Sequence, residues 1–369
     1  MINIAAPDIG SEEMGAVKEV LRSGMLAQGP VVSKFEENFA KYCGAKYAVA
    51  LNNGTAALHC AIVAAGVGAG DEVITIPFSF IATVNTILMQ AAKPVFVDIE
   101  PESFNIDYTK VEKAITKKTK AILPVDLYGQ PYDYDPIRKI ANRHKLKIIE
   151  DAAQAVGASY GKHKTGTLGD LSCFSLYATK NIMSGEGGVV ATGSKTYADR
   201  IKQFRQHGMT TMNDTYEYTE LGYNYRMTDL HAAIAVEQLK KTNKFNKLRQ
   251  TNAAKLSSEL VRIKGIKVPV TKPGRTHVFH QYTIRITDEF PLSRDEMANY
   301  LRSKGVGSGI YYPKPLHAYR HIAKLGYKLG DFPASEKAAR EVLSLPIHPK
   351  VSNFDIDKII NTFKEVSSA

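Results

Sequence analysis

The stretch LSCFSLYATKNIMSGEGGVV, residues 171–190, contains two apolar runs separated by a break at residues 178–181 and a glycine-rich turn. The runs predict two buried strands, so Lys180 follows the end of the first one. Lysine is rarely buried without a partner. Desolvation lowers the pKa of its amine and makes it a usable nucleophile, which Schiff-base chemistry requires. A surface lysine that caps a hairpin is the ordinary alternative.

Composition limits the classes of protein. A chain of 369 residues is too long for one compact core and suggests about two domains. The first residues lack the pattern of a signal peptide, and no apolar run reaches the length of a membrane span, so no membrane partner is expected. Three cysteines without metal-like spacing fit a reducing compartment, and a cytoplasmic location is expected.

The chain is basic, with a formal net charge of +11. Such a balance suits an anionic ligand or a nucleic acid. The basic residues are scattered, however, and the one dense cluster, residues 113–120, is interpreted as a solvated helix end. Nucleic-acid binding is therefore kept only as an alternative.

Short β-rich runs alternate with helical patterns in the first half of the chain. Helices are expected at residues 11–24, 32–42 and 135–144, and strands at 47–51, 72–77, 94–98, 121–125 and 147–151. This alternation predicts an α/β fold with a mostly parallel sheet flanked by helices.

Beyond about residue 244 the alternation ends, and a smaller α+β domain is expected. We place a large domain at residues 1–245 and a small C-terminal domain at 246–369, which a segment near the N-terminus is expected to join. The elements expected there are helices at 245–263, 293–304, 336–342 and 355–365 and strands at 277–286 and 310–312.

Several polar and aromatic residues fall at the expected ends of strands, where ligands bind in parallel sheets. They are Asn53, Gly54, Phe78, Ser79, Phe80, Asp126, Asp151 and Lys180. Residues 52–58 could present helix N–H groups to a phosphate or form an ordinary helix cap. Asp151 could pair with a cationic ring nitrogen or cap the next helix. Phe80 could stack on a ring or belong to the core, and Ser175 could bind phosphate or face a neighbouring strand.

Six motifs carry a resemblance that extends over essentially the whole chain. They are NNGTAAL (52–58), PFSFIAT (77–83), EDAAQAVGASY (150–160), GTLGDLSCFSLYATKNIMSGEGG (166–188), GYNYRMTDLHAAIA (222–235) and YYPKPLH (311–317). In this order and spacing they resemble the DegT/StrS family of nucleotide-sugar aminotransferases, which depend on pyridoxal 5'-phosphate (PLP) and have the fold-type-I architecture.

The resemblance implies roles at matching positions. Lys180 matches the lysine that binds PLP covalently and then transfers a proton between the substrate carbon and the cofactor. Asp151 matches the carboxylate on the pyridine nitrogen, and Gln154 matches a residue near the phenolic oxygen of the ring. Phe80 stands at the aromatic position that stacks on PLP. Together these residues imply a catalytic centre in which Asp151 keeps the ring protonated as an electron sink.

Further positions match the family's phosphate-binding and substrate-binding residues. Gly54, Thr55 and Ser175 match positions that bind the PLP phosphate. Asn224 matches an asparagine that reaches the phosphate held by the partner subunit, which implies a homodimer with a shared active site. Positions that contact sugar-nucleotide substrates in some members are matched by Arg226 and Tyr312.

The function implied is transfer of an amino group from an amino acid, expected to be glutamate, to a 3- or 4-keto nucleotide-linked sugar. Polysaccharide and antibiotic-sugar pathways both fit. One alternative is a PLP-dependent sugar dehydratase; sugar 3-dehydratases of this family carry histidine in place of the lysine, so Lys180 favours transamination. The other is a non-enzymatic regulator that binds nucleic acid. The histidine spacing predicts no metal site.

Overall fold

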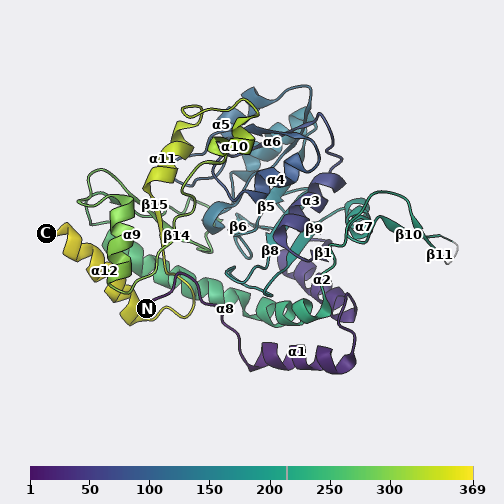
Figure 1. Cartoon of the computed structure of the whole chain (residues 1–369), viewed down its shortest axis with the longest axis horizontal. Helices are drawn as coiled ribbons and strands as arrows, with labels where there is room; N and C mark the ends of the chain where they lie inside the picture. The colour runs from purple at the N-terminus through teal and green to yellow at the C-terminus, as the bar shows by residue number, and fades with distance from the viewer. Residues whose placement is uncertain (213–214, 369) are drawn as a thin grey trace.

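The computed structural model describes residues 1–212 and 215–368. Its main feature is a seven-stranded sheet (Figure 1). The spatial order is β1 (Tyr47–Leu51), β9 (Gly188–Thr192), β8 (Leu171–Ser175), β5 (Lys147–Asp151), β4 (Thr119–Ile122), β2 (Glu72–Thr75) and β3 (Lys93–Phe96). The five strands from β8 to β3 are parallel, and β9 is antiparallel to both β8 and β1.

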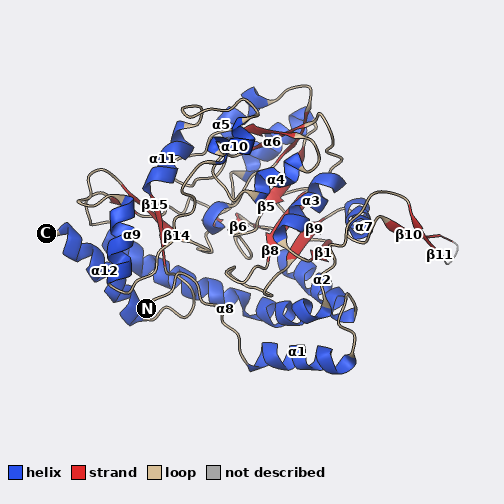
Figure 2. Ribbon diagram, viewed as in Figure 1, coloured by secondary structure: helices blue, strands red, loops and turns tan. Residues whose placement is uncertain are grey.

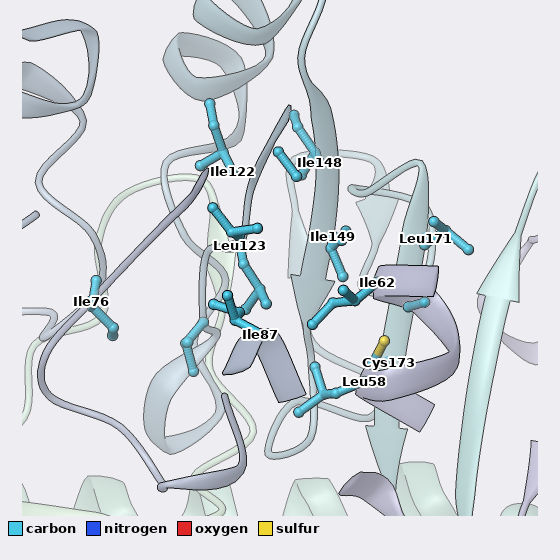
Figure 3. Packing of buried hydrophobic residues seen from close by; sticks show 14 of the residues in the cluster. Leu58, Ile62, Ile76, Ile87, Ile122, Leu123, Ile148, Ile149, Leu171 and Cys173 are labelled. Atoms are coloured by element: carbon cyan, nitrogen blue, oxygen red, sulfur yellow. The ribbon is translucent and has the colours of Figure 1, made fainter. Parts of the chain in front are cut away.

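The sheet is buried on both faces because alternate strand residues enter two different apolar clusters. On β1, Val49 and Leu51 belong to one cluster, whereas Ala48 and Ala50 belong to the other. Figure 3 shows the first cluster, in which side chains of the sheet pack against Leu58 and other helical residues. Burial on both faces explains the near-continuous apolar runs of these strands.

Helices cover both faces (Figure 2). The first cluster includes residues of α3 (Gly54–Ala64), α4 (Ala82–Leu88), α5 (Tyr108–Val111), α6 (Tyr134–His144), α7 (Lys195–Phe204) and α11 (Pro333–Glu341). The second includes residues of α2 (Pro30–Cys43) and α8 (Asp229–Leu260), and α1 (Ser11–Ser23) lies against the outer side of α8.

A smaller α+β body forms its own apolar cluster around the C-terminal part of α8. Its sheet has the order β12 (Ile266–Lys267), β14 (Tyr282–Ile286), β15 (Val342–Leu345), and its helices include α9 (Arg294–Ser303) and α12 (Asn353–Ser367). Near the N-terminus, Ile2 pairs with Val306 of this body. The expected division between residues 245 and 246 stays a prediction; it falls inside α8.

The remaining elements are short. β10 (Met209–Met212) and β11 (Thr215–Tyr218) form an antiparallel ribbon that projects from the molecule (Figure 1). The others are β6 (Ser159–Tyr160), β7 (His163–Lys164), β13 (Arg275–Thr276), α10 (Arg320–Ala323), η1 (Glu112–Ala114), η2 (Leu127–Gly129) and η3 (Leu316–Ala318). No helix of the described ranges combines the length and apolarity needed to cross a membrane.

Three predicted elements differ from the structure. The helix expected from residue 245 begins at Asp229, because the Thr228 side chain caps it by accepting from His231 N. The strand expected at 277–286 is confined to β14, since Phe279 has a φ of 45° that interrupts extended backbone. Residues 310–312 form no strand; the pairing stops at an isolated bridge between Gly309 and Ser344.

Candidate active site

Asp151 ends β5 at the carboxyl edge of the parallel strands and is only 4% exposed. Thr83 Oγ1 donates to Asp151 Oδ2 at 2.8 Å, and Ala153 N donates to Oδ1 at 3.3 Å. Burial raises the pKa of Asp151, while these donors and the charge of Lys180 lower it. The two hydrogen bonds thus hold the carboxylate in one orientation at the carboxyl edge of the sheet. The positive charge of Lys180 favours its ionised form.

Lys180 lies in the loop between β8 and β9, five residues after Ser175, which forms the last pair of their ladder with Gly188. Its side chain is partly exposed in the single chain, yet desolvation lowers the pKa of the amine to about 8, against a smaller opposing effect of Asp151. The backbone N–H of Lys180 donates to Tyr177 O at 2.8 Å, which fixes the turn. An amine with this pKa is available as a nucleophile near neutral pH.

Gln154 connects two segments on the same side of the sheet. Its Oε1 accepts from Tyr128 N at 2.7 Å, and its Nε2 donates to Tyr312 Oη at 3.2 Å. The Tyr312 ring lies 6.3 Å from the ring of Phe80, which is 56% exposed. The fold thus brings together Gln154, Tyr312 and Phe80, three residues singled out from the sequence, and the Phe80 ring is left exposed.

The start of α3 closely approaches the end of β8. The Asn53 side chain caps Ala56 N at 2.8 Å, and among the described residues no acceptor is recorded for the N–H groups of Gly54 and Thr55. A Cβ on Gly54 would lie 2.8 Å from Ser175 Cβ, so only glycine lets the helix start sit against Ser175. Free amides at a helix N-terminus beside a serine hydroxyl suit a phosphate.

We expect Gly54→Ala to destabilise the protein by about 1–3 kcal/mol, because the added methyl group overpacks this contact. It should also weaken cofactor binding, since the helix start moves away from Ser175. Thermal unfolding and PLP titration measure the two effects. Gly15→Ala is the matched control: its Cβ would meet nothing within 4 Å, and alanine favours the helix interior. Equal behaviour of the two variants would contradict the proposed packing.

Asn224 and Arg226 lie on a different segment, which runs from the β10–β11 ribbon to α8. Asn224 forms a bridge with Gln206 and is exposed, and Arg226 forms a bridge with Leu51 at the end of β1. Asn52 N also donates to Tyr225 O at 2.9 Å, which ties this segment to the strand that precedes α3. Within one chain no recorded contact joins Asn224 to Lys180 or Asp151 in the described ranges.

A profile of the DegT/DnrJ/EryC1/StrS aminotransferase family matches residues 7–364. The chain belongs to this family. It is a PLP-dependent aminotransferase, and the resemblance and α/β fold class expected from the sequence are confirmed.

The chain is similar to several characterised members. It is 39% identical to GDP-perosamine synthase of Caulobacter vibrioides, covering 99% of this chain and 98% of that protein. It is 38% identical to UDP-2-acetamido-2-deoxy-3-oxo-D-glucuronate aminotransferase of Pseudomonas aeruginosa, covering 93% and 92%. Among solved structures, S. venezuelae DesV in complex with a ketimine intermediate has a TM-score of 0.92 at 36% identity, covering 97% of this chain and 95% of that one.

The residues present fit PLP. The site offers an amine of lowered pKa, a buried carboxylate and the close α3–β8 contact that only glycine permits. Two supporting residues were missed by sequence reasoning. Thr83 lies in the PFSFIAT motif, which was a usable signal, in the first turn of α4 and eight residues beyond the end of β2. Tyr128, whose N–H holds Gln154, left no such signal because its contact depends on a turn with a φ of 59°.

Proposed function

We propose that this aminotransferase moves an amino group from an amino acid, with glutamate as the expected donor, to a 3- or 4-keto nucleotide-linked sugar. The observation that carries the proposal is the lysine of lowered pKa whose charge acts on a buried carboxylate at the sheet edge. The names of two relatives add support, because one contains a GDP-linked and the other a UDP-linked sugar, the latter with a 3-oxo group.

Different residues of the chain would carry different steps of this reaction. When bound, PLP supplies an electron sink that stabilises negative charge on the substrate carbon. Lys180 would hold the cofactor and its Nζ would then take the proton from the donor carbon and deliver one to the sugar carbon. Asp151 would hold the protonated ring nitrogen, kept in place by Thr83 and Ala153 N. Gly54, Thr55 and Ser175 would bind the phosphate, Phe80 would cover a ring face, and Gln154 would lie near the phenolic oxygen.

The second substrate is anionic, which suits a chain of net charge +11. We place Arg226 and Tyr312 at the sugar nucleotide. A homodimer would complete the site, because Asn224 is exposed and would reach the cofactor phosphate of the partner subunit. A cytoplasmic location and a place in cell-surface polysaccharide or antibiotic-sugar synthesis belong to the same proposal.

The purified protein tests the reaction directly. Glutamate should convert the yellow enzyme to its colourless amino form, and a keto nucleotide sugar should then restore the yellow form and yield an amino sugar by mass spectrometry. Formation of a dehydrated sugar would favour the dehydratase. Salt-sensitive binding of DNA without transamination from any donor would favour the regulator.

We expect Asn224→Ala to weaken PLP binding about tenfold, because one hydrogen bond to a charged phosphate is lost. Equilibrium dialysis of PLP measures this effect, and sedimentation shows whether the dimer also loosens. Asn353→Ala, at an exposed position of α12, is the control. Unchanged PLP affinity in Asn224→Ala would refute the contact across the dimer.

A further inference from the structure

Two acidic residues that the proposed reaction does not use lie beneath the site. Asp126 follows β4, and Glu150 is the residue before Asp151 in β5; both side chains have 0% exposure. Their segments are joined, since Asp126 N donates to Asp151 O at 3.0 Å. Two fully buried carboxyl groups therefore lie at the base of Asp151.

One oxygen of each carboxyl is accounted for by backbone donors. Asp126 Oδ1 accepts from Tyr132 N at 2.9 Å, and Glu150 Oε2 accepts from Gly166 N at 3.1 Å and Gly169 N at 3.3 Å. In the part of the chain that the structure describes, no N–H or O–H donor reaches Asp126 Oδ2 or Glu150 Oε1, and the two carboxyl groups interact with each other.

Ionised carboxylates only accept hydrogen bonds, so two of them cannot satisfy each other. Like charges in a dry interior also repel strongly, and one of the two groups then keeps its proton. No ion pair of the described residues includes Asp126 or Glu150, so no cation offsets a second charge. A single proton between the two free oxygens removes both difficulties.

We propose that Asp126 and Glu150 share one proton, with Asp126 as the donor, and that Asp126 is thereby a positioning residue for Asp151 and Gln154. Burial, followed by the charge of Glu150, raises the pKa of Asp126 well above its ordinary value, and burial also raises that of Glu150. The Ser172 hydroxyl lies near Glu150 without meeting hydrogen-bond geometry.

Among the described residues no cation pairs with Asp126 or Glu150; Arg138 and Lys164 act on the neighbouring Tyr132 and Cys43 but are held by Asp170 and by Tyr42 O. The titratable groups recorded near it from the neighbouring elements are Asp151 on β5, Tyr132 after η2, Cys43 on α2 and Cys173 on β8. The charge of Asp151 disfavours a second negative charge on the pair, and the tyrosine and the two cysteines offer no positive charge to offset one. The arrangement therefore favours the shared proton.

The pair holds the turn that orients Gln154. The Asp126 carboxyl closes residues 126–132 onto Tyr132 N, and within this turn Tyr128 N donates to Gln154 Oε1. A second charge would push this turn away from β5 and raise the pKa of Asp151. The link to catalysis rests on the proposed function, because it uses the roles of Asp151 and Gln154. The shared proton itself does not depend on the proposed function.

Infrared spectroscopy of the PLP-loaded full chain at about pH 8 tests the proton directly. The wild type should show the C=O absorption of a protonated carboxyl group. Asp126→Asn should remove it, and Glu150→Gln should shift its frequency, because burial keeps the proton on Asp126 while its acceptor changes from a carboxylate to an amide. Absence of the band in the wild type, or a band of unchanged frequency in Glu150→Gln, would overturn the sharing. These readouts hold whether or not any keto sugar is a substrate.

Rescue by the conservative variant tests the positioning role. The amide of Asp126→Asn is neutral and can donate to Glu150, so the PLP dissociation constant and the pH profile of the yellow band should stay within about twofold of wild type. Asp126→Ala leaves Glu150 without this donor and should weaken PLP binding at least about tenfold. Equal loss in both variants would overturn the positioning role.

A third measurement remains decisive if the alanine variant does not fold. Folding raises the pKa of Asp126, so the stability it contributes is present below the unfolded value of about 3.9 and is lost as pH rises toward the folded value. Relative to Asp126→Asn, the unfolding constant of wild type should therefore rise about tenfold per pH unit in that window. Parallel stability profiles would overturn the shared proton.

Discussion

Lys180→Ala is expected to lower turnover by more than about 10⁴-fold, because one substitution removes both the amine that binds the cofactor and the group that transfers the proton. The yellow absorbance band of the lysine-bound cofactor should disappear as well. The fold should remain, since Lys180 lies in a loop and no salt bridge among the described residues includes its side chain. Visible spectra, circular dichroism and a coupled transamination assay measure these effects.

Lys162→Ala is the matched control for this experiment. Lys162 is an exposed lysine in the turn between β6 and β7, so its loss should leave the spectrum and the rate unchanged. A Lys180→Ala enzyme that still transaminates at a comparable rate would show that another amine carries the chemistry. A variant that loses its secondary structure would show that the loop around Lys180 is needed for folding.

Asp151→Asn is expected to slow proton removal by about a hundredfold or more, equivalent to roughly 2.7 kcal/mol of transition-state stabilisation. The amide keeps an oxygen for Thr83 Oγ1, so the site should hold its shape and still bind PLP. It cannot carry the negative charge that keeps the ring nitrogen protonated. Stopped-flow measurement of the donor half-reaction isolates this step from release of the product.

The control is Asp288→Asn, an amide substitution at an exposed aspartate before Phe290. It should leave the half-reaction unchanged. Near-normal rates in Asp151→Asn would mean that Asp151 serves only to cap the segment after β5, the ordinary alternative that its position allows. Loss of PLP from the variant, rather than a slower step, would show that Asp151 acts mainly in binding.

Much of the large domain was predictable because it depends on local signals. The apolar runs of β5 and β8 have the expected bounds or nearly so, since a strand buried on both faces needs apolar residues throughout. The C-terminal α+β body was predicted less well. The strand expected at 277–286 is present but shortened to β14, because Phe279 has a positive φ. The strand expected at 310–312 is absent, since pairing there is limited to a single bridge at Gly309. Neither feature leaves a pattern in composition.

Motif order and strand-end position are properties of the chain, so the fold class, the family and the candidate roles of Lys180 and Asp151 were predictable without a structure. The tertiary structure decided which groups act on these residues. Three interactions join separate segments of the sequence: the hydrogen bond from Thr83 to Asp151, the hydrogen bond from Tyr128 N to Gln154, and the interaction between the carboxyl groups of Asp126 and Glu150. Only the packing of parallel strands brings such groups into one dry space, where burial sets their charge.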